Sequence, residues 1–276
     1  MMGEGALALE ELEIDLLLEA LSQRFGHDFR AYDRPALRRK LHGVMRQCLL
    51  TTVSSLQDRA LHAPEVGSHL LRALSVPPAA LFDDPEQARQ LRIVLASCLR
   101  ASAVPKVWLA ECAGAGQAWS LAILLAEEQL HLRTEIYATA ANEEMLAQAN
   151  LASFPAEHLP QYQESYVRSG GTADLADYFD VADGRAVLTE SLRSRITWAQ
   201  YNMVTDASFN EFQMIICQRA LPDFGPLLRQ RVLRLFHDSL SLFGMLGLDR
   251  EIAEGDPLAA NYQPVFAHQA WYKRIG

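Results

Sequence analysis

A turn of small residues, 112–116, stands where a sheet domain could bind a ligand. The apolar run before it, 107–110, predicts a buried strand. A strand, a turn and a helix in this order open a doubly wound α/β domain, in which nucleotides and related ligands bind at the carboxyl ends of the strands. Gly114 and Gly116 would let the backbone approach such a ligand. An ordinary strand-to-helix turn fits them as well. The helix is predicted from apolar residues at helical spacing: Trp119, Leu121, Ala122, Leu124 and Leu125.

The other reactive side chains indicate neither a metal site nor a hydrolase. The four cysteines, Cys48, Cys98, Cys112 and Cys217, are far apart and form no C-x-x-C pair. We therefore expect buried free thiols in a reducing cytosol rather than zinc ligands or disulfides. The eight histidines show no metal-ligand spacing, and His237 is expected to pack in the core. No Ser-His-Asp or Cys-His arrangement has a local signature.

Composition and charge exclude several classes of protein. Half of the residues are hydrophobic and 21% are charged, as in soluble globular proteins. The formal net charge of −9 argues against a general nucleic-acid-binding protein. No apolar run approaches the roughly 20 residues of a membrane span. The acidic amino-terminal stretch has neither the basic start nor the cleavage site of a secretory signal. We expect a cytoplasmic protein without membrane insertion, of undetermined oligomeric state.

One helix concentrates positive charge on this acidic chain. Pro35 suits the first turn of a helix over residues 36–50, and that helix carries Arg38, Arg39, Lys40 and Arg46. A solvated helix face is one interpretation. The other is a docking surface for an acidic partner, since clustered positive charge steers and orients such partners.

Helical patterns fill the first quarter of the chain. They cover residues 8–24, 36–50, 54–62 and 65–74, which predicts an all-helical domain over residues 1–76. Residues 77–90 are predicted to be a linker. Within it, Asp84 can cap a helix that begins at Pro85.

The remainder, residues 91–276, alternates strand and helix, as a parallel sheet requires. Strands are predicted at 107–110, 134–139, 196–199, 214–217 and 244–247, with helices at 120–128, 143–153 and 226–239. Asp183-Gly184 lies between two β-prone runs and predicts a hairpin over residues 178–189. The predicted fold is a doubly wound α/β domain with a small antiparallel insertion, preceded by an all-α domain.

Several stretches together resemble the CheR-type chemotaxis-receptor methyltransferases, over about residues 14–275. They include IDLLLEALSQRFGHDFRAYDRPALRRKLHGVM, VWLAECAGAGQAWSLAILL, IYATAANEEMLAQA and MIICQRALPDFGPLLRQRVLRLFHDSLSLFGMLGL. The resemblance implies a Rossmann-like S-adenosylmethionine (SAM) methyltransferase fold and methylation of receptor glutamate side chains. A carboxylate attacks the activated methyl group of SAM directly, so such a protein mainly aligns the two and excludes water. The hairpin is similar in place to a family appendage that docks a receptor's terminal peptide in some members. A simple sheet extension fits it equally.

Carried over position by position, the family's cofactor contacts are partly replaced. In the linker, Pro77 and Ala79 stand for Asn and Thr, and Asp83 stands for Arg. Both acids of the family's A-T-D-I-D are absent, with Ala140 and Asn142 in their places. The remaining replacements are Glu111 and Ala115 for glycines, Gly116 and Gln117 for a Glu-Glu pair, Trp119 for Tyr, Gln218-Arg219 for Arg-Asn, and Pro222-Asp223 for Ile-Tyr.

The aligned cofactor-binding residues are Gly114, Gly116, Gln117, Asn142, Asn202, Met203, Gln218 and Arg219. Losing one charged contact costs on the order of 1.5–3 kcal/mol. Four or five such losses could remove most of the ~8 kcal/mol that a micromolar ligand needs. Gln117, Asn142 and Asn202 can still form hydrogen bonds.

Three functions follow as hypotheses. The first is a CheR-like protein with an eroded SAM site and weak or lost catalysis, which binds chemoreceptors or other chemosensory proteins through the basic helix. The second is an active, divergent glutamate methyltransferase of a chemotaxis or pilus-type array. In the third, the altered pocket binds another nucleotide or small effector, with Asp83 and Arg219 as new charges. No catalytic residue is predicted.

Overall fold

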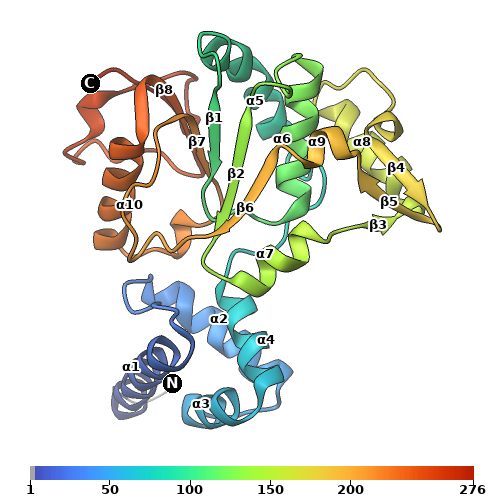
Figure 1. Cartoon of the computed structure of the whole chain (residues 1–276). Coiled ribbons are helices and arrows are strands. Elements are labelled where there is room, and N and C mark those ends of the chain that lie inside the picture. The colour runs from blue at the N-terminus through green and yellow to red at the C-terminus, as the bar shows by residue number, and fades with distance from the viewer. Residues whose placement is uncertain (1–3) are drawn as a thin grey trace. The chain divides into compact units, whose positions relative to one another are not determined.

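The computed structural model describes residues 4–276, which form two compact units (Figure 1). The first unit, here the helical unit, consists of the residues up to 77 together with 219–232. The second, here the α/β unit, consists of residues 78–218 and 233–276. No helix among the described residues is long and apolar enough to cross a membrane.

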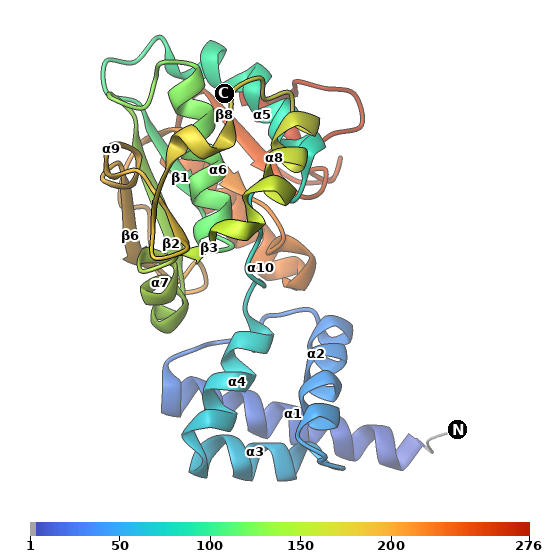
Figure 2. The same cartoon turned by 90° about the vertical axis from the view of Figure 1, so that its right-hand side faces the viewer.

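Four helices build the core of the helical unit: α1 (Glu4–Phe25), α2 (Arg34–Gln47), α3 (Val53–His62) and α4 (Pro64–Leu74) (Figure 2). Asp33 caps α2 by accepting a 3.0 Å hydrogen bond from the Ala36 N–H, and Thr52 caps α3 by accepting one from Ser55. The helices bury one continuous cluster, whose most enclosed members include Ile14, Leu17, Leu18, Leu21, Leu37, Leu41 and Leu56. The all-α amino-terminal domain predicted from the apolar spacing is therefore confirmed.

A segment far away in the sequence completes the helical unit. The short 3₁₀ helix η3 (Leu221–Asp223) lies beside the chain before α2: the Asp33 N–H donates to the Asp223 carbonyl at 2.8 Å. The Gly225 N–H donates to the Ala31 carbonyl at 3.0 Å. A Cβ at Gly225 would lie 2.6 Å from that carbonyl oxygen, so only glycine permits this approach. The sequence patterns did not predict this return of the chain.

The α/β unit contains a seven-stranded sheet of order β6-β2-β1-β7-β8-β10-β9. The strands β1 (Lys106–Leu109), β2 (Glu135–Ala140), β6 (Ile196–Gln200), β7 (Phe212–Cys217) and β8 (Leu240–Leu248) are parallel. They are the five strands predicted from the sequence. The antiparallel strands β9 (Tyr262–Pro264) and β10 (Trp271–Arg274) extend one edge and were not predicted.

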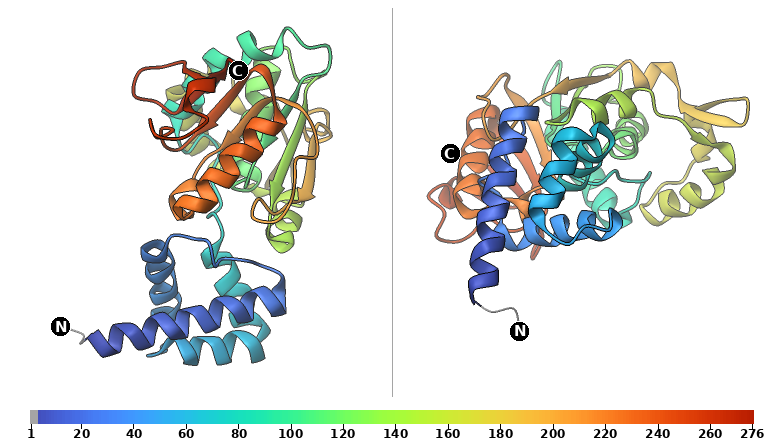
Figure 3. Two further views of the ribbon diagram at one scale, coloured as in Figure 1. Left: turned by 90° about the vertical axis from the view of Figure 1, so that its left-hand side faces the viewer. Right: turned by 90° about the horizontal axis from the view of Figure 1, so that it is seen from below.

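Helices cover both faces of this sheet. Val107 and Leu109 pack in the cluster formed with α5 (Pro85–Leu99) and α6 (Ala115–Glu127). Trp108 points to the opposite face, where it contacts Phe212 and Phe236. Phe236 lies in the carboxyl half of α10 (Pro226–Ser239) (Figure 3). Helices on both faces of a parallel sheet make the fold doubly wound, as predicted.

The predicted helix boundaries need small corrections. Helix α10 has the predicted bounds, and Asp84 caps α5 at Pro85 as expected. Helix α6 begins at Ala115, five residues before the predicted start. Helix α7 (Glu143–Asn150) and helix α2 both end three residues early, at Asn150 and Gln47.

The antiparallel insertion is larger than a hairpin. Strands β4 (Phe179–Ala182) and β5 (Arg185–Leu188) pair as predicted, with Asp183 and Gly184 at φ 50° and 71° in the turn. Two positive φ values match the twist that a two-residue hairpin requires. A third strand, β3 (Phe154–Pro155), makes the order β3-β5-β4. Helix α8 (Leu159–Arg168) follows β3, and the short helix α9 (Glu190–Arg193) follows β5.

Candidate cofactor site

The turn between β1 and α6 adopts a conformation that suits close approach of a ligand. Gly114 has φ 84° and is the N-cap of α6 without a side-chain cap, so the first N–H groups of that helix face outward from its end. Glu111 also has a positive φ, 51°, at a position where the family has glycine. The Cys112 N–H donates to the Thr139 carbonyl at 2.7 Å, which joins the turn to the end of β2.

Gly116 is required for packing. A Cβ there would lie 2.2 Å from the Ala79 carbonyl oxygen, so the linker backbone rests directly on α6. The Ala79 N–H donates to the Ala113 carbonyl at 2.7 Å. The Ser120 hydroxyl accepts from the Phe82 N–H at 2.9 Å. These contacts fasten residues 79–82 to α6 and fix the position of Asp83.

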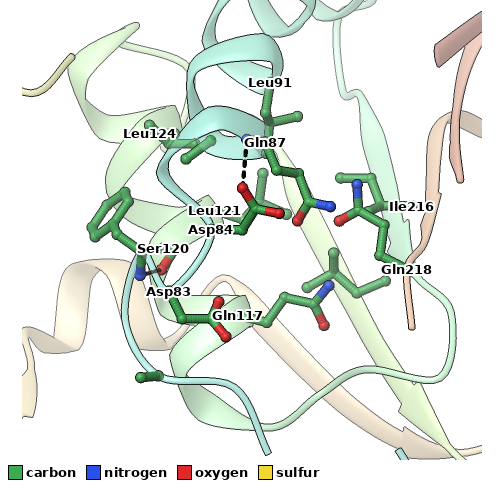
Figure 4. A pocket seen from close by; sticks show the side chains of 14 residues that line it. Asp83, Asp84, Gln87, Leu91, Gln117, Ser120, Leu121, Leu124, Ile216 and Gln218 are labelled. Carbon is green, nitrogen blue, oxygen red and sulfur yellow. Dashed lines mark hydrogen bonds between the residues drawn. The ribbon is translucent and has the colours of Figure 1, made fainter. Parts of the chain in front are cut away.

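Three carboxamides and two carboxylates meet beside this contact. Asp83, Asp84 and Gln87, with Gln117 and Gln218, line a small cavity between α5, α6, β1 and β7 (Figure 4). Its volume is about 50 Å³, enough for a few water molecules. The Gln117 side-chain oxygen accepts from the Ala113 N–H at 2.7 Å, and Asp84 caps α5.

Gln218 directly follows β7 and is only 4% exposed. In Figure 4 its side chain points into the cavity. Arg219 follows it with φ 78°, an unusual conformation for a residue other than glycine, and belongs to the helical unit.

The end of β2 carries no carboxylate. Ala140 is buried, and its methyl group cannot accept a hydrogen bond from a ribose hydroxyl. Asn142 is 4% exposed and caps α7: its side-chain oxygen accepts from the Met145 N–H at 3.2 Å. The Tyr201 N–H donates to the Ala140 carbonyl, so the end of β6 lies alongside. The two positions predicted for the family's acids therefore hold a methyl group and a capping amide.

The residues after β6 are used in local structure. The Asn202 side-chain oxygen accepts from the Val204 N–H at 2.9 Å, and the Asn202 N–H donates to the Asp206 carboxylate at 2.9 Å. Met203 is 2% exposed. Asn202 therefore shapes a turn at this edge of the sheet, and Met203 forms part of the core beneath it.

Two buried thiols, Cys112 and Cys217, lie near the carboxyl ends of β1 and β7. Burial, with a smaller contribution from the nearby Glu111 carboxylate, raises the pKa of Cys112 to about 12. Burial also raises the pKa of Cys217 well above its ordinary value, and the Asp249 and Glu111 carboxylates add to this. Both thiols stay protonated at neutral pH, so neither is a nucleophile.

The sequence analysis named Glu111 only as the replacement for a glycine and did not predict its burial, and it did not predict the hydrogen bond of Ser120 to the linker. An acid directly after an apolar strand was the available signal for Glu111. The hydrogen bond between Phe82 and Ser120 joins residues 38 positions apart, so no local sequence pattern predicts it.

Three of the five lysine and arginine side chains of the basic helix α2 form ion pairs within the helical unit, the first being Arg34 with Asp15. Arg38 pairs with Glu11 and lies 3.7 Å from Glu10, and Lys40 lies 2.6 Å from Asp223. Arg39 and Arg46 are exposed, and neither makes an ion pair with any residue that the structure describes.

We predict that Gly116→Ala destabilises the α/β unit by about 1–3 kcal/mol, because overpacking forces the linker off α6. The matched control is Gly43→Ala, inside α2, where a Cβ meets nothing within 4 Å. That control should stabilise the protein by roughly 0.5–1 kcal/mol. Urea denaturation measures both. Equal stability of G116A and the native chain would contradict the packing role.

Comparisons with known proteins agree with the site's place in the fold. The sequence model for "CheR methyltransferase, SAM binding domain" matches residues 80–251, and that for "CheR methyltransferase, all-alpha domain" matches residues 12–75. The chain is 35% identical over 265 residues to "Putative methyltransferase Cher3" of Pseudomonas putida, covering 96% of this chain and 97% of that one.

More distant similarities are weaker. An uncharacterized 104.1 kDa protein of Rhodobacter capsulatus is 24% identical over 84% of this chain, which spans only 24% of that protein. A solved glycopeptide N-methyltransferase, MtfA, complexed with SAM, has a TM-score of 0.38 and 14% identity, covering 72% of this chain and 71% of that one. The family assignment therefore rests on the sequence matches: this chain belongs to the CheR methyltransferase family, and its α/β unit carries the family's SAM-binding domain.

Proposed function

We propose that this chain is a CheR-family protein of a chemosensory system whose SAM pocket is eroded, so that methyl transfer is weak or lost. The observation that carries the proposal is the end of β2, where Ala140 and the capping amide of Asn142 replace both family acids. SAM supplies an activated methyl group when bound, and holding its ribose there would depend on contacts that these two side chains lack.

The charge at the linker supports the same proposal. Asp83 stands where the family has arginine, and it lines the cavity together with Asp84. A carboxylate repels both the methionine carboxylate of SAM and an acceptor glutamate. Gln218, in place of the next family arginine, adds no positive charge. The pocket keeps its backbone frame and loses the charges that oriented an anionic acceptor.

Restoring one acid should restore SAM affinity. In Asn142→Asp the new carboxylate can still cap α7, since Asp and Asn are equally good N-caps, and it would face the position expected for the ribose. We expect calorimetry to show no binding of SAM or S-adenosylhomocysteine to the native chain below about 1 mM, and a gain of about tenfold in N142D, equivalent to roughly 1.4 kcal/mol.

The control for this variant is Asn150→Asp, the same chemical change at an exposed position of the same helix. N150D should leave affinity unchanged. Micromolar binding of SAM to the native chain would contradict the eroded pocket and favour an active enzyme.

We further propose that the helical unit binds chemoreceptors in the cytoplasm through α2. Receptor helices that carry methylation sites are rich in glutamate. The exposed guanidinium groups of Arg39 and Arg46 are the available cations, because Arg38 and Lys40 are paired within the unit. Strand β4, at the edge of the order β3-β5-β4, offers a second place for a receptor peptide.

The double variant Arg39→Glu/Arg46→Glu should weaken binding to a purified chemoreceptor cytoplasmic fragment by about tenfold, measured by surface plasmon resonance at low salt. Arg59→Glu is the control, an exposed arginine on α3. Binding that is equal in all three proteins, or absent in the native chain, would count against the receptor surface.

An active, divergent glutamate methyltransferase is the second candidate. The positive φ values of Glu111 and Gly114 favour it, because they are the backbone conformation that glycines would adopt in such a turn. Transfer of labelled methyl groups from SAM to receptor fragments, as base-labile glutamate esters, would establish it. We expect transfer at less than about one hundredth of a typical turnover number of 10 s⁻¹.

A further inference from the structure

A second, larger cavity lies near the amino ends of β7 and β8, at the other end of the strands from the candidate cofactor site. It has a volume of about 330 Å³, which falls in the range of small-molecule sites. Its wall includes the end of α5, the start of β7 and the first half of β8. The side chains that matter here are Cys98, Gln213, Leu242, Phe243, Met245 and Lys273.

A bulge in β8 shapes this cavity. Phe212 pairs with Leu240 and Met214 with Met245, so Gln213 alone faces four residues of β8. The extra residues push Leu242 and Phe243 outward, and they are 54% and 59% exposed. Phe243 has φ 65°, a conformation that is rare and costly for a bulky residue. Bulges and strained residues of this kind are concentrated at functional sites.

One cation is held over the exposed ring. The Lys273 ammonium lies 5.3 Å from the centroid of Phe243. No carboxylate among residues 4–276 lies within 4 Å of it, although the chain carries a net charge of −9. The neighbouring Cys98 thiol donates to the Gln213 carbonyl at 3.0 Å, and burial raises its pKa to about 11. It therefore stays neutral and adds no negative charge beside the ammonium.

We propose that this cavity binds a small organic anion with an aromatic or aliphatic body. Its anionic group pairs with the Lys273 ammonium, and its body packs on Phe243, Leu242 and Met245. The pairing uses a cation without an ion-pair partner in the described chain, and the packing covers two apolar side chains that are otherwise in water. The site is separate from the carboxyl ends of the parallel strands, so it needs neither SAM nor a methyl acceptor.

Two fluorescent probes with one ring system test this. 8-Anilinonaphthalene-1-sulfonate carries an anionic group, and N-phenyl-1-naphthylamine lacks it. We expect the native chain to bind one equivalent of each. Lys273→Met should weaken binding of the sulfonate at least fivefold and leave the neutral probe unchanged. Phe243→Ser should weaken both at least fivefold.

Two controls match these variants elsewhere on the chain. Arg59→Met removes an exposed cation, and Leu151→Ser removes an apolar side chain that is 81% exposed. Neither should change binding of either probe. Circular dichroism establishes that all variants fold. Equal sulfonate binding by the native chain and K273M, or loss of both probes on K273M alone, would overturn the proposal. Absence of binding of both probes to the native chain would also overturn it.

Discussion

The parallel pairing of β1 with both of its neighbours is the constraint on which the candidate cofactor site depends. Leu109 lies level with Ala138 on β2 and with Ile216 on β7. The segments that follow β2, β1 and β7 therefore all begin at the carboxyl ends of the strands, and the turn after β1 lies between the other two. The register is set by buried apolar side chains on both faces. These side chains pack above and below the sheet. The polar residues that follow the carboxyl ends of the strands can therefore change without loss of the fold.

That separation explains how a family fold persists while its pocket changes. Gly114 and Gly116 serve the backbone: one has a positive φ, and the other lets the linker rest on α6. The Asn142 side chain has a structural role, since it caps α7. Ala140 has no polar group and contributes only to the packing. An intact backbone frame with altered charges is what the proposed loss of methyl transfer would leave.

The sequence predicted those helices and strands whose apolar residues recur at a regular spacing or whose ends carry a capping residue. Helix α10 was predicted to the residue because Pro226 starts it and its apolar residues recur at helical spacing. Helix α8 was missed because Tyr166 is its only fully buried residue, which leaves no apolar stripe to detect. The glycine turn was predicted, but the reason for Gly116 required the position of Ala79, 37 residues earlier. The basic helix was also predicted, whereas the pairing of Arg38 with Glu11 joins residues too far apart for any local pattern.

Helix α5 connects the two cavities of the α/β unit. Its first turns, with Gln87 and Leu91, line the small cavity near the turn after β1, and its end, with Cys98, lines the larger one at the β8 bulge. At 1.5 Å per residue, these sites lie roughly 15 Å apart along one helix. Its amino end is held by the Asp84 cap, and the residues before it are held on α6 by the close approach of Ala79 to Gly116. Its carboxyl end packs against β7 and β8, where the Cys98 thiol donates to the Gln213 carbonyl. Both cavities therefore share one wall that is fixed at its two ends.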